Sequence, residues 1–242
     1  MELILVRHGQ PDWEPGGLAV DNPNLTPLGH AQARCVAQAL AEEHFDAIYV
    51  SPLLRAAQTA EPLLKQRQAE AKTASWLREM GMPVLEGQTT EQIRDYFARV
   101  QNRPIEDWWE GMPGGERFEH FYQRVSAGIE ELLSTSQGVE IHENNPQRLW
   151  RVPDPSARIL IVAHEGTNAA LITHLLGLEP VPWIHLHFSS AWCGISRLHT
   201  LRLGAHHIWS LESFNRVEHL TEEASQSAGR TATFENAKAS TS

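Results

Sequence analysis

An arginine, a histidine and a glycine end the first apolar run of the chain, where residues 3–9 read Leu-Ile-Leu-Val-Arg-His-Gly. A guanidinium binds phosphate through a planar fork of N–H donors. A neutral imidazole can attack phosphorus without first losing a proton. Arg7 and His8 therefore have the chemistry of a nucleophile that faces an anion. Gly9 ends the run and frees the backbone to turn.

Two later segments carry groups of the same kind. Arg55 lies in the first turn of an expected helix after residues 45–50, and His164 follows the strongly apolar residues 158–163. In an open α/β sheet, ligands bind at the carboxyl edge of the parallel strands. We therefore expect both side chains at one edge with the first pair. A helix that begins at Gly166 adds free N–H groups there.

The spacing of apolar residues predicts the elements that hold these groups. Short apolar runs alternate with helical patterns, which is typical of a mostly parallel sheet with helices on both faces. We expect a three-layer α/β/α domain over residues 1–220. The strands are expected at 3–6, 45–50, 158–163, 183–188, 192–201 and 206–211, the last two as a hairpin, and the helices at 26–40, 51–64, 116–133 and 166–176.

Three segments depart from this alternation. Residues 68–114 hold several Trp, Met, Gly and Pro residues around one expected helix at 89–100, and we interpret them as a small helical cap over the site. Residues 136–157 are polar and rich in Pro and Asn, which predicts an exposed loop. Residues 221–242 are mostly Ser, Thr, Ala and charged residues, which bury too little to order themselves, so we expect a disordered tail.

Composition limits the partners and the compartment. The net charge of −10 and pI near 5.7 argue against nucleic acid and anionic membranes as partners. Cys35 and Cys193 form no metal or redox motif, which favours a reduced, cytoplasmic setting. The chain starts without a signal-peptide pattern, and no stretch approaches the roughly 18 apolar residues of a membrane span. The sequence does not indicate the oligomeric state.

Six stretches together resemble the histidine phosphatase superfamily, also called the phosphoglycerate mutase-like family. They occur in the family's order, and they cover most of residues 1–215. Each is a weak signal alone, whereas the combination is highly specific. The resemblance implies a phosphoglycerate mutase-like fold. The stretches are LVRHG (5–9), LTPLGHAQA (25–33), SPLLRAAQTA (51–60), LREMG (77–81), PGGERFEHFYQRV (113–125) and VAHEGTNAALITHLLG (162–177).

The resemblance also implies a role for each matched side chain. His8 corresponds to the nucleophile that becomes phosphohistidine, and Arg7 and Arg55 to the two phosphate-binding arginines. His164 corresponds to the second histidine, which donates to the transferring phosphoryl group. Glu79 corresponds to the acid that protonates the leaving oxygen and then activates water. No metal ion or other cofactor is implied, because guanidinium and imidazole groups can supply the charge stabilisation that phosphoryl transfer needs.

Some assignments stay open. Asp12 and Glu86 are alternatives to Glu79 as the acid. Trp13, with Trp108 and Trp109 from the cap, would either form an aromatic wall for an organic leaving group or simply pack the cap, and we favour packing for the latter two. Gly9 and Gly166 complete the expected substrate-binding residues.

Two positions depart from the family pattern. The family usually has Gly after the second histidine, but here it is Glu165, whose carboxylate repels phosphate unless it points away or binds a cationic substrate group. Arg117 stands where Ser is usual, and we favour a surface ion pair over a second anion contact. Residues 10–24 also differ from the mutases, where this loop helps to hold phosphoglycerate.

The remaining histidines give a weaker signal. His185 and His187 have strand spacing, which would place both rings on one side, and His206 and His207 lie on a later strand. No Asp or Cys stands at ligand spacing with them, so the sequence does not predict a metal site.

The expected function is metal-independent hydrolysis of a small phosphorylated metabolite through a phosphohistidine. A phosphoglycerate mutase is the first alternative, and the divergent loop after Gly9 argues against it. A non-catalytic module that binds a phosphorylated ligand is the second, and the presence of His8, Glu79 and both arginines argues against that. The sequence does not identify the substrate.

Overall fold

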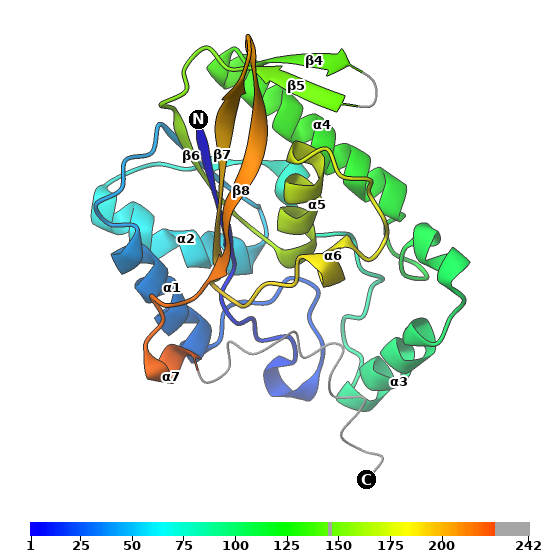
Figure 1. Cartoon of the computed structure of the whole chain (residues 1–242). Coiled ribbons are helices and arrows are strands. Elements are labelled where there is room, and N and C mark those ends of the chain that lie inside the picture. The colour runs from blue at the N-terminus through cyan, green and yellow to red at the C-terminus, as the bar shows by residue number, and fades with distance from the viewer. Residues whose placement is uncertain (145–146, 226–242) are drawn as a thin grey trace.

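A single sheet of eight strands organises the molecule, with the strand order β3-β2-β6-β1-β7-β8-β5-β4. The structure is a computed structural model that describes residues 1–144 and 147–225. Helices lie on both sides of the sheet (Figure 1), so the predicted three-layer α/β/α architecture is confirmed. The strands are β1 (Glu2–Arg7), β2 (Ala47–Val50), β3 (Lys72–Thr73), β4 (Glu140–Asn144), β5 (Gln147–Arg151), β6 (Arg158–Ala163), β7 (Ile195–Leu203) and β8 (His206–Arg216).

The helices follow most of the predicted positions. The helix predicted at 89–100 is α3, which begins with a capping box between Thr89 and Gln92. The α-helices are α1 (Pro27–Ala39), α2 (Leu54–Arg67), α3 (Thr90–Gln101), α4 (Phe118–Gln137), α5 (Glu165–Leu175), α6 (Ile184–His187) and α7 (Glu222–Ser225), and the 3-10 helices are η1 (Pro15–Gly17), η2 (Ser75–Leu77) and η3 (Ile105–Glu110).

The sheet changes character at β1. The strands β3, β2, β6 and β1 pair in parallel, whereas β7, β8, β5 and β4 continue the sheet with antiparallel pairs. In the parallel half, Arg7 is level with Ala163, and Val50 is level with Val162. This register brings the ends of β1, β2 and β6 to one edge of the sheet.

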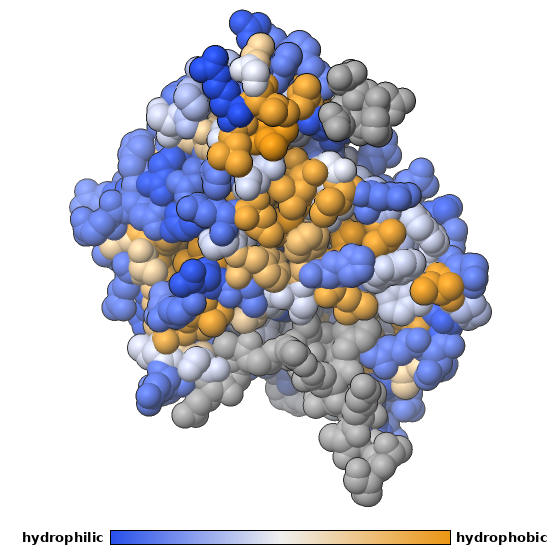
Figure 2. Space-filling view, in the orientation of Figure 1, coloured by the Kyte–Doolittle hydropathy of each residue, from blue (hydrophilic) through white to orange (hydrophobic). Residues whose placement is uncertain are grey.

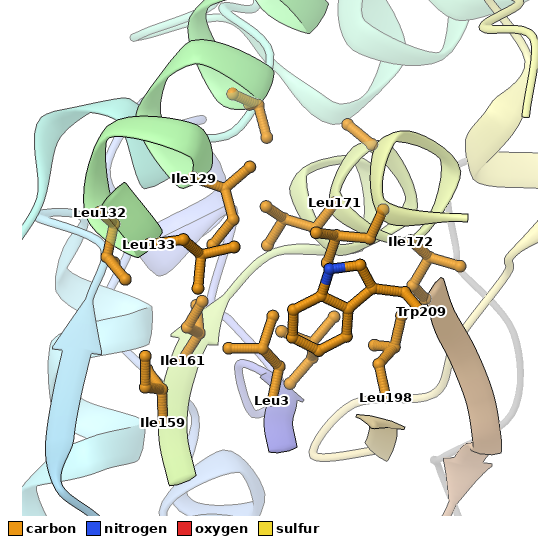
Figure 3. Packing of buried hydrophobic residues seen from close by; sticks show 14 of the residues in the cluster. Leu3, Ile129, Leu132, Leu133, Ile159, Ile161, Leu171, Ile172, Leu198 and Trp209 are labelled. Atoms are coloured by element: carbon orange, nitrogen blue, oxygen red, sulfur yellow. The ribbon is translucent and has the colours of Figure 1, made fainter. Parts of the chain in front are cut away.

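Alternation along β1 separates two hydrophobic cores. Leu3 and Leu5 pack with α4 and α5, and Ile4 and Val6 pack with α1 and α2. Figure 3 shows the first core, where Leu3 and side chains of α4 and α5 converge with Trp209. Because β1 is buried on both faces, its last residues are held rigidly at the edge of the sheet.

The segment predicted as an exposed loop at 136–157 is instead the end of α4 followed by the β4–β5 hairpin. Trp150 is fully buried, and its ring lies 6.3 Å from that of Trp209. The prediction of a loop was wrong because few residues of the hairpin, such as Trp150, face the core. Their polar neighbours in the sequence hide the apolar pattern of a strand.

Two more predicted elements differ from the structure. Residues 184–187 form the short helix α6 and not a strand, since a brief apolar run does not distinguish the two by periodicity alone. Residues 222–225 form α7, in which Ala224 is buried and its carbonyl accepts a hydrogen bond from Gln32. The rest of the predicted tail, 226–242, lies outside the described residues.

Apolar residues also reach the surface. Figure 2 shows a band of apolar surface along the middle of one face, where β8, α5 and α6 lie in Figure 1. The exposed apolar side chains of these and adjacent elements include Leu186, Leu201 and Ile208. Within residues 1–144 and 147–225, none of the helices combines the length and apolar character needed to cross a bilayer.

Candidate active site

Arg7 and His8 lie at the carboxyl edge of the parallel strands, and these residues are 5% and 4% exposed. The chain then turns at Gly9, where an added Cβ would lie 2.7 Å from the carbonyl oxygen of Gly29. The Gly9 N–H donates to Thr59 Oγ1 at 2.9 Å, which ties this turn to α2. Only glycine fits here without moving α1, so the turn that follows His8 is fixed.

The His8 ring has a defined tautomer. Nδ1 lies 2.7 Å from the Gly9 carbonyl oxygen, which can only accept, so Nδ1 carries the proton. Nε2 accepts from Arg55 Nε at 3.2 Å and therefore holds the lone pair. Burial, and then the charges of Arg55 and Arg7, hold the pKa of His8 well below its usual value. The ring is neutral at neutral pH, as a nucleophile must be.

His164 follows β6, occupies the position just before α5 and is fully buried beside His8. The two ring centroids are 5.1 Å apart. Nε2 lies 2.7 Å from Ser51 Oγ, a hydroxyl that can donate to it and leave the ring proton on Nδ1. Burial, and then Arg55, hold the pKa of His164 well below its usual value. Ser51 was not singled out in the sequence, although it begins the stretch that carries Arg55.

Three buried nitrogens at this edge have no hydrogen-bond partner among the described residues. They are Arg7 Nε, Arg55 Nη1 and His164 Nδ1. Burial lowers the pKa of Arg55 to about 10, so it remains charged at neutral pH. Buried polar groups are normally hydrogen-bonded, and donors from three different elements here share one region with the His8 lone pair. The arrangement suits an anion with several acceptor oxygens.

Glu79 is bound to the N-terminus of α5. Its Oε1 accepts from the Met80 N–H and its Oε2 from the Gly166 N–H, both at 3.0 Å. A Cβ at Gly166 would lie 2.6 Å from Glu79 Oε1, so this approach requires glycine. Burial raises the pKa of Glu79, while the two N–H groups and Arg55 oppose the shift. The structure thus brings this carboxyl group next to the His164 turn.

Arg124 of α4 holds the backbone that carries Glu79, and the sequence did not reveal this. Its Nη1 donates to the carbonyls of Trp76 and Arg78 at 2.9 and 3.1 Å. Its Nε and Nη2 bind Glu116 at 3.1 and 2.7 Å. Both residues belong to the matched stretch 113–125, which is the one signal that could have pointed to them. The alternative acids Asp12 and Glu86 are exposed.

Trp13 lies at the outer side of the same edge, 42% exposed, with its ring centroid 4.9 Å from Arg55 Cζ. Its loop is held on both sides. Ala19 exchanges backbone hydrogen bonds with Gln88 and Gly87 of the cap at 2.9 Å. The N–H of Leu54, at the start of α2, donates to Asn22 at 3.0 Å. Trp13 is therefore fixed between the cap and the arginine.

The other two candidate tryptophans pack within and beside the cap, as favoured from the sequence. The Trp108 ring lies 5.0 Å from Arg103 Cζ. The Trp109 ring meets Phe118 of α4 edge-on at 5.8 Å. Of the three, only Trp13 has a described contact with the group around His8.

The two departures from the family pattern have different surroundings. Arg117 Nη2 pairs with Glu110 at 2.9 Å at the surface, which confirms the favoured interpretation. Glu165 is buried and lies 3.3 Å from Arg7 Nη1, so its carboxylate binds an arginine of the site itself. His185 and His187 lie on α6, not on a strand. Among the described residues, no group of three or more His, Cys, Asp and Glu side chains is arranged to hold a metal ion.

Comparison with known proteins finds matches over most of this fold. Residues 3–144 match the family described as the histidine phosphatase superfamily (branch 1). Phosphoserine phosphatase 1 of Hydrogenobacter thermophilus is 28% identical over 182 residues, which are 74% of this chain and 78% of that protein. A 2,3-bisphosphoglycerate-dependent phosphoglycerate mutase of Cytophaga hutchinsonii is 28% identical over 78% of this chain and 83% of its own. A mycobacterial glucosyl-3-phosphoglycerate phosphatase structure is 26% identical with a TM-score of 0.68, covering 89% of this chain and 99% of that chain.

Proposed function

Because the chain belongs to the histidine phosphatase superfamily, we propose that it hydrolyses a small phosphomonoester through a phosphohistidine on His8. One observation carries the proposal. The lone pair of His8 Nε2 shares the sheet edge with the nitrogens of Arg7, Arg55 and His164 that have no partner among the described residues. A phosphoryl group satisfies these donors and presents phosphorus to the lone pair.

In the first step, His8 Nε2 attacks phosphorus in line with the ester oxygen, and the bond from phosphorus to that oxygen breaks. Glu79 gives its proton to the leaving oxygen, so a neutral alcohol departs. The His8 ring acquires positive charge when Nε2 is phosphorylated. The Gly9 carbonyl, which already accepts the Nδ1 proton at 2.7 Å, stabilises that charge.

In the second step, the Glu79 carboxylate takes a proton from water, and the resulting hydroxide attacks phosphorus. The bond between phosphorus and His8 Nε2 breaks, and inorganic phosphate leaves. Glu79 is again protonated and His8 is again neutral, so the cycle closes without another reactant. Burial favours the protonated form of Glu79 by raising its pKa, which suits a group that must begin as an acid.

The chemistry requires no metal ion in this proposal. Phosphoryl transfer depends mainly on positioning and on stabilising charge on the phosphoryl oxygens. Arg7 and Arg55 supply two fixed positive charges at the sheet edge, and His164 supplies a further donor. These groups are held by β1, by α2 and by the turn that follows β6. When substrate binds in this proposal, Arg55 Nε gives up its 3.2 Å hydrogen bond to His8 Nε2, and the freed lone pair faces phosphorus.

The alcohol part of the substrate lies against Trp13 in this proposal. The ring is the exposed aromatic group in contact with Arg55, so a substrate whose phosphate meets the arginine places its organic part nearby. Small phosphorylated metabolites fit this arrangement. The phosphoserine and glucosyl-3-phosphoglycerate named for the relatives are candidates of that class.

The test is release of phosphate from 4-nitrophenyl phosphate with excess EDTA, for the wild type and His8→Ala. We expect turnover to survive the chelator and to fall about 10⁴-fold or more in the variant, as for other removed nucleophiles. Circular dichroism confirms that the variant is folded. Turnover retained by folded His8→Ala, or lost by the wild type on adding EDTA, would overturn the mechanism. Isomerisation of added 3-phosphoglycerate would instead identify a mutase.

A further inference from the structure

Glu165 introduces a negative charge next to a site built for an anion. It is the first residue of α5, it directly follows His164, and it is 8% exposed. Its Oε1 accepts from Ser189 Oγ and from the Ser190 N–H, both at 3.0 Å. The carboxylate is therefore fixed in place from a second segment of the chain.

The same oxygen holds one end of Arg7. Glu165 Oε1 lies 3.3 Å from Arg7 Nη1, and that nitrogen also donates to the Ser190 carbonyl. Nη1 is thus engaged away from the phosphate, while Nε is buried without a partner among the described residues. The guanidinium plane cannot rotate without breaking these contacts, so Glu165 helps to decide which edge of Arg7 faces the phosphoryl group.

Glu165 also changes the charge balance of the site. Arg7 and Arg55 are both buried, and a buried guanidinium without a counterion is strongly unfavourable. Glu165 offsets one of the two positive charges before any phosphate binds. A bound phosphate is repelled by the Glu165 carboxylate and shares Arg7 with it. The affinity of the site for phosphate is therefore lower than it would be with two arginines and no neighbouring carboxylate. Weaker binding of inorganic phosphate favours its release after hydrolysis. Tight binding of phosphate would bring no gain in kcat, because only interactions that are stronger in the transition state than in the ground state raise it.

The negative charge of Glu165 also acts on the Glu79 carboxyl group. The groups that act on the Glu79 carboxyl include Arg7 on β1, Arg55 on α2 and the N–H of Met80. From α5 they include the Gly166 N–H, the Thr167 hydroxyl and the Glu165 charge. Burial is the main cause of its raised pKa, and Glu165 adds to the shift as a like charge. Loss of the Glu165 charge therefore favours earlier loss of the Glu79 proton as pH rises.

We propose that Glu165 is a positioning residue that orients Arg7 and limits the affinity of the site for inorganic phosphate. The inference rests on the proposed phosphatase function. It assigns the carboxylate to the protein's own arginine and not to a cationic group of the substrate. In this proposal, the residue after His164, which is usually glycine in the superfamily, adjusts how readily inorganic phosphate leaves the site.

The test compares Glu165→Gln with the wild type. The amide keeps an acceptor oxygen for Ser189 and Ser190 but removes the charge. We expect the inhibition constant for inorganic phosphate to fall about tenfold, as for removal of one nearby like charge in a partly screened site. We also expect the alkaline limb of the kcat/KM profile to move to lower pH. A phosphate affinity that is unchanged or weaker would overturn the proposal.

Two further variants separate the effect of the Glu165 charge on phosphate binding from an effect on folding. Glu130→Gln removes a carboxylate of α4 that binds His174 of α5 and Arg148 of β5 and has no described contact with Arg7, so phosphate inhibition should be unchanged. If Glu165→Gln does not fold, Glu165→Gly is measured in the same way. A smaller increase in phosphate affinity is then expected, because the charge is removed but Arg7 also loses the contact that orients it. Isothermal titration with phosphate needs no turnover. Wild-type protein that neither binds nor releases phosphate would contradict the proposed function, whereas an active wild type with an unchanged Glu165→Gln would contradict only this inference.

Discussion

The two sides of the candidate site are built in different ways. On the phosphate side, Arg7, His8 and His164 end or follow strands that are buried on both faces, and none of them is more than 5% exposed. On the side proposed for the leaving alcohol, Trp13 is 42% exposed and lies on a loop held to the cap by a few hydrogen bonds. The first side is part of the core and the second is attached to it. This difference suggests that the reaction and the choice of substrate can change independently.

The largest effect among the variants that examine this difference is expected for Glu79→Gln. The amide still accepts from the Gly166 N–H, but it has no proton to give. We expect kcat/KM for an alkyl phosphate to fall about 10²- to 10³-fold, with a much smaller loss of kcat/KM for 4-nitrophenyl phosphate, whose leaving group needs no proton. The value of kcat should fall for both substrates, because Glu79 also activates water in the proposed second step. The alkaline limb of the pH profile, where Glu79 loses its proton, should disappear.

Glu86→Gln is the matched control, because Glu86 is an exposed carboxylate of the cap. Its kinetics should equal those of the wild type. An equal loss in both variants, or an alkaline limb that persists in Glu79→Gln, would assign the acid elsewhere.

Gly166→Ala should have an intermediate effect. The new methyl group would lie 2.6 Å from Glu79 Oε1 and displace the carboxyl group from the start of α5. We expect a loss of about ten- to a hundredfold in kcat for alkyl phosphates, because a shift of about 1 Å in a catalytic group can cost that much.

A double variant tests the cause of that loss. If the methyl group acts only through Glu79, then Gly166→Ala combined with Glu79→Gln is no slower than Glu79→Gln alone. Additive losses would mean that Gly166 contributes to phosphate binding in its own right, and the separation of the two sides would then be less complete.

The smallest effect is expected for Trp13→Ala. The exposed Trp13 ring contacts Arg55 and, in the proposed function, the alcohol, so its removal should raise KM for 4-nitrophenyl phosphate about two- to fivefold. KM for a small aliphatic phosphate and kcat for both should change little. Trp109→Ala removes a similarly exposed ring that packs on Phe118, and it should leave both KM values unchanged. Equal changes in the two variants would assign Trp13 to packing.

The phosphate side could be predicted from the sequence because its residues directly follow buried strands. Apolar runs located the ends of β1 and β6, and parallel pairing then placed Arg7, His8 and His164 at one edge. The hydrogen bond from the Gly166 N–H to the Glu79 carboxylate joins residues 87 positions apart. Nothing in either segment alone indicates that bond, and the resemblance supplied only the identity of Glu79.

The incorrect parts of the prediction share a physical cause. The β4–β5 hairpin places Trp150 in the core, but most of its residues are polar, so composition suggested a loop. The apolar residues of α6 were too few to distinguish a helix turn from a strand. The ion pair between Glu165 and Arg7 joins α5 to β1. It depends on the packing of the whole edge, which local patterns do not encode.

Arg124 has a consequence for how such proteins diversify. It binds the carbonyls of Trp76 and Arg78 from α4, so the segment that ends in Glu79 is fastened to the body of the molecule before the rest of the cap begins. Insertions, deletions or whole exchanges between residues 82 and 113 can therefore accumulate without moving Glu79, the proposed proton donor. New substrates become accessible to evolution, or to an engineer who grafts a relative's cap, while the residues proposed to break the ester are inherited intact.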